Sequence, residues 1–127
     1  MNATIYIITK AMMQLGFMPD YNGFMYLRSA VYIAMKDPEA ITLVTKLIYA
    51  PLAKEYETTA LNIEKSIRKA AESVWKNNEL SGKTVNVLNG TYTYPETRPE
   101  NRELIALLMR FVKESGEIFD TDIREGI

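Results

Sequence analysis

The side chains with the most chemistry to offer lie together in residues 58–75, "TTALNIEKSIRKAAESVW". They are hydroxyls, amides and cations, which hydrogen-bond to base edges and phosphates. Arg68 can donate two hydrogen bonds to guanine, and Asn62 can form two with adenine. Histidine and cysteine are absent from the whole chain, so the usual general base, zinc ligand and thiol nucleophile are missing. We therefore expect a binding protein, not an enzyme, without a cofactor or a bound metal.

A long amphipathic helix would position these groups, since apolar residues recur at a period of about 3.6. The buried side of its helical wheel carries Ala60, Ile63, Ile67, Ala70, Ala71 and Val74. The opposite side carries Leu61, Asn62, Lys65, Arg68, Lys69, Glu72 and Lys76. A hydroxyl of Thr58 or Thr59 would cap the helix, beside backbone amides suited to a phosphate. Such a basic face is either a DNA-contacting surface or an ordinary solvated face, and its period alone favours the ordinary one.

The residues before this helix favour a helix-turn-helix motif. In that motif a small residue of the first helix packs close to a β-branched residue of the second. Ala53 is the small residue, and Ile63 follows it by ten positions. Glu57 occupies the turn position that often holds glycine. We expect the motif at about residues 49–77, with residues 59–76 as its recognition helix.

Helical patterns also cover most of the remaining chain. Together with the recognition helix, helices are expected at residues 5–15, 24–35, 37–48, 51–56 and 99–116. Gly16 would end the first of them, and Asp37 would cap the third. The expected fold class is all-α, a bundle of about six helices.

One segment differs in kind. In "KTVNVLNGTYTY", β-branched and aromatic residues alternate around Asn89-Gly90, which predicts a short β-hairpin wing at 84–94. Lys83 at its base would reach the DNA backbone. We expect Tyr92 and Tyr94 to be the most exposed tyrosines. The tyrosines on predicted helix packing faces are Tyr26, Tyr32, Tyr49 and Tyr56.

Charge confines any nucleic-acid surface to one region. The net charge is −1, but residues 1–76 carry nine Lys/Arg and seven Asp/Glu, whereas residues 77–127 carry six and nine. No stretch is apolar and long enough to span a bilayer, and the N-terminus lacks the features of a signal peptide. We therefore expect a cytoplasmic protein with no membrane partner.

Two parts of the chain are expected. Residues 1–116 form a helical effector domain, and residues 117–127 form an acidic tail. Asp120, Asp122 and Glu125 in the tail lack the glycine and terminal glutamate of a calcium-binding loop. A solvated tail is therefore the expectation.

Three segments carry a family resemblance: "GFMYLRSA" (23–30), "LAKEYETTA" (52–60) and "IEKSIRKA" (63–70). They resemble the C-terminal effector domain of the stage-zero sporulation protein A family, response regulators that start sporulation. The similarity runs from about Ile8 to Trp75 and resumes at "RPENRELIALLMRF". The resemblance implies a six-helix bundle whose recognition helix enters the major groove of double-stranded DNA. It also implies RNA polymerase as protein partner and a weak homodimer on adjacent DNA sites.

The resemblance also assigns roles by position. Glu64 and Arg68 match residues of the family's recognition helix, and Thr58 and Thr59 would lie near the DNA backbone at its start. Lys65 and Asn62 stand where the family usually has arginine, and Lys69 stands at a histidine position. Lysine keeps the charge but loses the planar fork of arginine, so base preference can differ. Glu64 either accepts a hydrogen bond from a cytosine amine or holds Arg68 through an i,i+4 pair.

Other features depart from the family. Its N-terminal receiver domain has no counterpart in these residues, which leaves an isolated effector domain or a relative under another control. The predicted hairpin also replaces a short fifth helix. The leading hypothesis is a sequence-specific DNA-binding transcription regulator. The alternative is a protein-interaction module, an antagonist or adaptor, that kept the fold but lost strong DNA binding.

Overall fold

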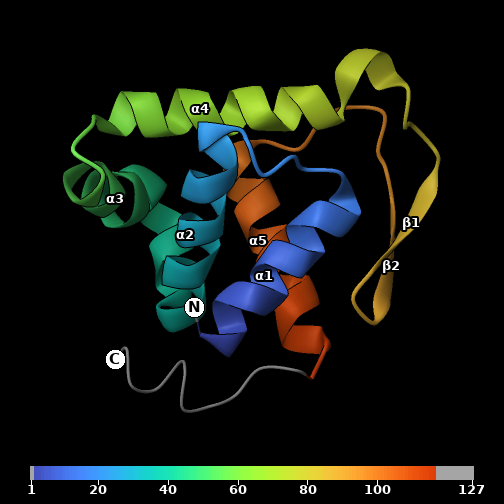
Figure 1. The fold of residues 1–127 in the computed structure, drawn as a ribbon, viewed down its shortest axis with the longest axis horizontal. Helices are drawn as coiled ribbons and strands as arrows, with labels where there is room; N and C mark the ends of the chain where they lie inside the picture. Colours follow the sequence, from blue (N-terminus) through green and yellow to red (C-terminus); the bar gives the residue numbers. More distant parts are fainter. Residues whose placement is uncertain (1, 117–127) are drawn as a thin grey trace.

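The fold is mainly helical, with one small antiparallel hairpin, as the sequence predicted (Figure 1). The computed structural model describes residues 2–116, so the expected acidic tail at 117–127 lies outside the described residues. The helical elements are α1 (Ala3–Leu15), α2 (Asn22–Lys36), the 3-10 helix η1 (Pro38–Leu43), the π-helix η2 (Thr45–Tyr49), α3 (Ala50–Glu55), α4 (Ala60–Val74), the 3-10 turn η3 (Lys76–Asn78) and α5 (Asn101–Glu114). Strands β1 (Thr84–Val87) and β2 (Gly90–Thr93) form the hairpin.

Helix α4 lies across one end of a bundle made by α1, α2 and α5 (Figure 1). Helix α3 lies near the N-terminal end of α4, and the hairpin lies beyond its C-terminal end. One face of α4 therefore seals the bundle, and the opposite face points away from it. No helix within residues 2–116 is long and apolar enough to cross a membrane.

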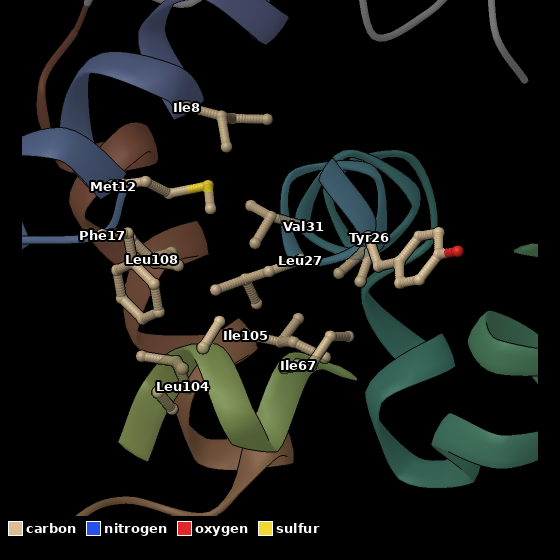
Figure 2. Close-up of a cluster of buried hydrophobic side chains, with 14 of the residues drawn as sticks. Ile8, Met12, Phe17, Tyr26, Leu27, Val31, Ile67, Leu104, Ile105 and Leu108 are labelled. Atoms are coloured by element: carbon tan, nitrogen blue, oxygen red, sulfur yellow. The ribbon is translucent and has the colours of Figure 1, made fainter. Parts of the chain in front are cut away.

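The core is continuous across these helices, with α2 at its centre (Figure 2). Ile8 of α1, Leu27 of α2, Ile67 of α4 and Leu108 of α5 are each fully buried. Each such side chain contributes about 1.5–3 kcal/mol relative to its exposed state. All five residues expected on the inner side of the last helix are buried, namely Leu104, Ile105, Leu108, Phe111 and Val112.

Gly23 brings α2 unusually close to α4. An added Cβ there would overlap the Ser66 carbonyl oxygen and lie 2.9 Å from the Ala70 Cβ. Backbone contact of this kind requires a residue without a side chain. The approach of α2 thus sets the position of the middle of α4.

Helices α1 and α5 are capped at their ends by specific residues. The Asn2 side chain accepts a hydrogen bond of 2.8 Å from the Ile5 amide, and Gly16 ends α1 with a φ of 105°. At α5, Glu100 and Glu103 form a capping box, in which each side chain accepts from the other's backbone amide. Gly16 is the helix end that the sequence predicted.

The segment between α2 and α4 differs from the regular helix expected at 37–48. Asp37 makes no side-chain cap, so that expectation was wrong. The chain runs from η1 through η2 into α3 without a break, and the Ala50 amide donates to the Thr45 carbonyl in a π-type bond. Pro51 explains the wider turn, since its ring would meet the Leu47 carbonyl in a regular α-helix.

The expected recognition helix at 59–76 is observed as α4 and is slightly shorter. Thr59 is its N-cap, accepting a hydrogen bond of 3.0 Å from the Asn62 amide. The helix ends at Val74, with Trp75 at its C-cap. Trp75 is buried, and the chain continues from it into the 3-10 turn η3.

The hairpin is present, but its turn lies one residue earlier than Asn89-Gly90. Val87 pairs with Gly90, which leaves Leu88 and Asn89 as the turn residues. Leu88 adopts a φ of 53°, a left-handed conformation, and its amide donates to Gln14 Oε1 over 2.7 Å. Asn89 Nδ2 donates to the Ser115 carbonyl over 2.7 Å. These two anchors offset the cost of a leucine at positive φ.

Tyr92 and Tyr94 were expected to be exposed, and this was wrong. Tyr94 is buried and Tyr92 is half-buried. Both rings pack edge-on against Trp75, and Tyr92 also contacts Phe111. Burial raises the pKa of both phenols above their ordinary value, and for Tyr92 the Tyr94 phenol adds to the rise. Tyr26, Tyr32, Tyr49 and Tyr56 are buried or half-buried, as expected.

Candidate nucleic-acid interface

The helix-turn-helix packs as its spacing predicted. Ala53 of α3 and Ile63 of α4 are both buried, and the two helices are in contact. Glu57 occupies the turn with a φ of 52°, the left-handed region that usually holds glycine. The Thr58 amide then bonds the Ala53 carbonyl over 2.8 Å. A single residue in the left-handed conformation thus turns the chain from α3 into α4.

The outward face of α4 presents exposed polar and basic groups. Asn62, Lys65 and Lys69 are all exposed, while Ile63 and Ile67 behind them are fully buried. Leu61 is 61% exposed in the first turn of the same helix. The sequence had placed Leu61 on this face without giving it a role. An apolar side chain there can contact a thymine methyl group.

The start of α4 is held by two threonines. Thr59 caps the helix, and Thr58 Oγ1 accepts a hydrogen bond of 2.9 Å from Asn62 Nδ2. That bond uses one of the two amide hydrogens of Asn62. The second hydrogen and the amide oxygen, the pair that adenine recognition needs, are not used by that bond.

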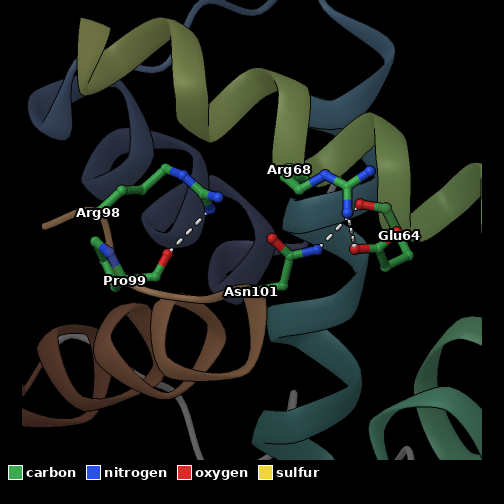
Figure 3. A network of polar contacts seen from close by, with 5 residues as sticks. All are labelled: Glu64, Arg68, Arg98, Pro99 and Asn101. Atoms are coloured by element: carbon green, nitrogen blue, oxygen red, sulfur yellow. Dashed lines mark hydrogen bonds and ion pairs between the residues drawn. The ribbon is translucent and has the colours of Figure 1, made fainter. Parts of the chain in front are cut away.

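Glu64 and Arg68 form an i,i+4 ion pair on one flank of α4 (Figure 3). Arg68 Nη1 lies 3.0 Å from Glu64 Oε1, and the two side chains are 43% and 31% exposed. Of the two roles left open for Glu64, the structure shows the one that holds Arg68. Exposed pairs of this kind contribute only about 0.3–0.5 kcal/mol, so the pair orients Arg68 more than it stabilises the fold.

Asn101 fastens α5 to the same flank. Its Nδ2 donates to the Glu64 backbone carbonyl over 3.0 Å. Tyr49 lies beside it, and burial raises the pKa of the Tyr49 phenol, while a hydrogen bond with Asn101 lowers that pKa by less. Tyr49 therefore stays a neutral hydrogen-bonding group at neutral pH.

A groove of about 340 Å³ runs along this flank. Its lining residues are Val44, Thr45, Tyr49, Glu64, Arg68, Arg98, Glu100, Asn101 and Arg102. Three arginines thus meet from two distant parts of the chain, although the sequence had singled out only Arg68. The "RPENR" run from Arg98 to Arg102 was visible, but nothing in the pattern placed it beside α4.

The hairpin is not shaped as a projecting wing. Its tip is tied to α1 and to the end of α5 by the Gln14 and Ser115 hydrogen bonds. Lys83 is exposed at its base, before β1 begins. The residues that the sequence predicted to contact DNA from the recognition helix all lie on α4 or at its start. Lys83 does not, since it lies between η3 and β1. Among residues 2–116, no group of three acidic side chains could hold a metal ion.

A short helix, a tight turn and a second helix with a basic outer face define a helix-turn-helix domain of the DNA-binding class. The family model described as "Sporulation initiation factor Spo0A C terminal" matches residues 8–112. The chain belongs to this family. It is a DNA-binding, transcription-regulating effector domain family rather than an enzyme family.

Proposed function

We propose that this chain is a sequence-specific DNA-binding transcription regulator whose helix α4 lies in the major groove. The observation that carries the proposal is the two-sided character of α4. Its inner face is fully buried at Ile63 and Ile67, while its outer face presents exposed Asn62, Lys65 and Lys69. The family match also supports DNA as the binding partner.

The dimensions of α4 suit a groove. A helix of 15 residues is about 22 Å long, and the major groove is wide enough to admit it. Asn62 and Arg68 would contact base edges, the first at adenine and the second at guanine. Lys65 and Lys69 would contact bases or nearby phosphates, and Thr58 and Thr59 would lie near the backbone at the helix start.

Fluorescence anisotropy with two labelled duplexes tests this proposal. One duplex carries a box of the family type, and the other carries the same bases scrambled, each at two salt concentrations. We expect preferential binding to the box that weakens with salt. Arg68→Ala should reduce the preference by a factor that corresponds to about 1–3 kcal/mol.

Arg110→Ala is the matched control. Arg110 also faces a glutamate at i,i+4, Glu114, but it lies more than two turns along α5 from Asn101. Its loss should leave both affinities unchanged. Equal, feeble binding of the wild type to both duplexes would contradict the proposal for that box, and selection from random DNA would then test for a shifted specificity.

The proposal also covers the domain boundaries, the self-association and the protein partner of the chain. We propose that residues 1–116 act as one effector domain in the cytoplasm, and that two copies associate weakly on adjacent DNA sites. Analytical ultracentrifugation with one-box and two-box duplexes measures that association. RNA polymerase is the proposed protein partner, which a pull-down with the purified enzyme on box DNA tests.

A protein-interaction module is the second candidate, and one observation favours it. On α1, Tyr6 is 64% exposed and Met13 is 53% exposed. They line a shallow hollow with Thr9, Lys10 and Gln14. Large exposed apolar side chains in one place often mark a protein contact. A chain that binds neither the box nor any selected DNA would support this candidate.

A further inference from the structure

We propose that Arg98 and Arg102 form, with Arg68, a phosphate-binding groove beside α4 that holds the DNA backbone. The inference rests on the proposed function and deepens it. It adds a second DNA-contacting element, the segment that leads into α5, to the recognition helix. Arg98 and Arg102 would bind a phosphate oxygen, while Arg68 keeps its proposed contact with a base.

The three arginines line one groove. Figure 3 shows Arg68 on α4 and Arg98 on the segment before α5, with Asn101 between them. Arg102 lies in the first turn of α5. Arg98 also lines a neighbouring hollow of about 300 Å³ with Lys76, at the C-terminal end of α4. Arg98 therefore lies beside both hollows, which connects the groove at Arg68 with Lys76 beyond the C-terminal end of α4.

Arg98 and Arg102 form no ion pair within residues 2–116, although Glu64 and Glu100 line the same groove. Glu64 holds Arg68, and Glu100 is engaged in the capping box of α5. Arg98 donates only to the Pro99 carbonyl, over 3.2 Å, and neither Arg98 nor Arg102 has a carboxylate within 4.0 Å in the described part of the chain. Arg102 is exposed, whereas Arg98 is half-buried, and a half-buried arginine without an anionic partner is uncommon.

The groove is also held in a fixed shape. The Asn101 bond to the Glu64 carbonyl ties the start of α5 to α4, so Arg98 and Arg102 keep their place relative to Arg68. Arginine binds phosphate through two parallel N–H donors, and a preformed site loses less entropy on binding. When a helix lies in the major groove, the phosphates of a bordering strand run along its flank. A backbone phosphate is thus the anion that this flank would meet.

The test measures how log Kd depends on log salt for wild type, Arg98→Gln, Arg102→Gln and the double variant. Each lost phosphate contact should lower the slope by about 1. The two single variants should weaken binding to box and scrambled duplexes by the same factor. Arg110→Gln serves as the matched control, and Arg98→Lys should retain the wild-type slope because it keeps the charge. Circular dichroism checks that each variant is folded.

The outcomes separate this inference from the proposed function. A box preference with an unchanged slope in the double variant would overturn the groove and leave the function standing. A wild type without box preference, whose slope still falls in the double variant, would support the groove and contradict sequence-specific binding. Trp75 lines the hollow that Arg98 also lines, so its fluorescence can be followed while inorganic phosphate or ATP is added. A response to inorganic phosphate or ATP that the double variant loses, in a protein that binds no DNA, would overturn the DNA backbone as the ligand.

Discussion

Gly23→Ala separates helix propensity from packing, because the two effects have opposite signs. Alanine is a better helix former than glycine by about 0.8–1 kcal/mol, so propensity alone predicts a more stable protein. The structure predicts the reverse. The new Cβ would overlap the Ser66 carbonyl oxygen and lie 2.7 Å from its carbon, both of which belong to the α4 backbone.

The magnitude follows from what has to move. No side-chain rotation relieves contact with a backbone carbonyl, so α2 and α4 must separate by a noticeable fraction of an ångström. Overpacking of this kind costs about 1–3 kcal/mol and occasionally more. The contact with Ser66 would be far shorter than normal atomic contacts allow. We therefore expect the free energy of unfolding to fall by about 2 kcal/mol or more. The melting temperature should fall by roughly 8 °C.

Urea unfolding followed by circular dichroism measures this effect. Gly90→Ala is the matched control, since its Cβ would meet the Phe111 ring at 3.0 Å, and a ring can shift by a few tenths of an ångström. Gly90→Ala should therefore lower the free energy of unfolding by less, about 1 kcal/mol or less. A Gly23→Ala protein as stable as wild type would refute the close approach of α2 to α4. A folded variant should also bind box DNA less tightly, because α4 is displaced.

Two further predictions concern individual side chains. If Leu61 contacts thymine methyl groups, replacing every thymine of the box by uracil should weaken wild-type binding severalfold, and Leu61→Ala should abolish the difference between the two duplexes; equal wild-type affinities would exclude that contact. Burial raises the pKa of Tyr94 in the folded state, so its contribution to stability is complete below the unfolded value, near 10, and is lost as pH rises through the folded value. Tyr94→Phe should therefore reduce the loss of folding stability at alkaline pH. It should also lower stability at neutral pH by about 1 kcal/mol, because it removes the hydrogen bond of 2.7 Å to the Leu15 carbonyl. An unchanged alkaline unfolding profile in Tyr94→Phe would contradict this assignment.

The local features of the fold could be predicted from the sequence. The period of α4, the spacing of Ala53 and Ile63, and the glycine that ends α1 are short-range signals. Each depends on residues that are close in the sequence. The expected sides of α4 therefore agree with the observed burial at Ile63, Ile67 and Val74.

Features that depend on contacts between distant residues could not be predicted. Tyr94 was expected to be exposed, but it is buried because it packs against Trp75 and its hydroxyl bonds the Leu15 carbonyl. Likewise, Arg98 and Arg102 carry no pattern that links them to Arg68. Only the docking of α5 against α4, through Asn101, brings the three arginines together.

One expectation about the site changed in meaning. The sequence offered Glu64 as either a base contact or a partner for Arg68, and the ion pair of 3.0 Å shows the second. Arg68 is therefore turned toward the flank that carries the groove. Whether Arg68 reaches guanine depends on its bond to Glu64. Weakening that bond in Glu64→Gln should therefore change the preference of the protein for the box duplex.

Base substitution in the DNA tests the central claim, α4 in the major groove, most directly. Duplexes whose purines are replaced by 7-deazapurines lose the N7 acceptors of the major groove and keep the backbone and minor groove. We predict that wild-type protein loses most of its box preference on such a duplex, and that Arg68→Ala then costs nothing further. Undiminished wild-type preference for the 7-deaza box would contradict the placement of α4 in the major groove.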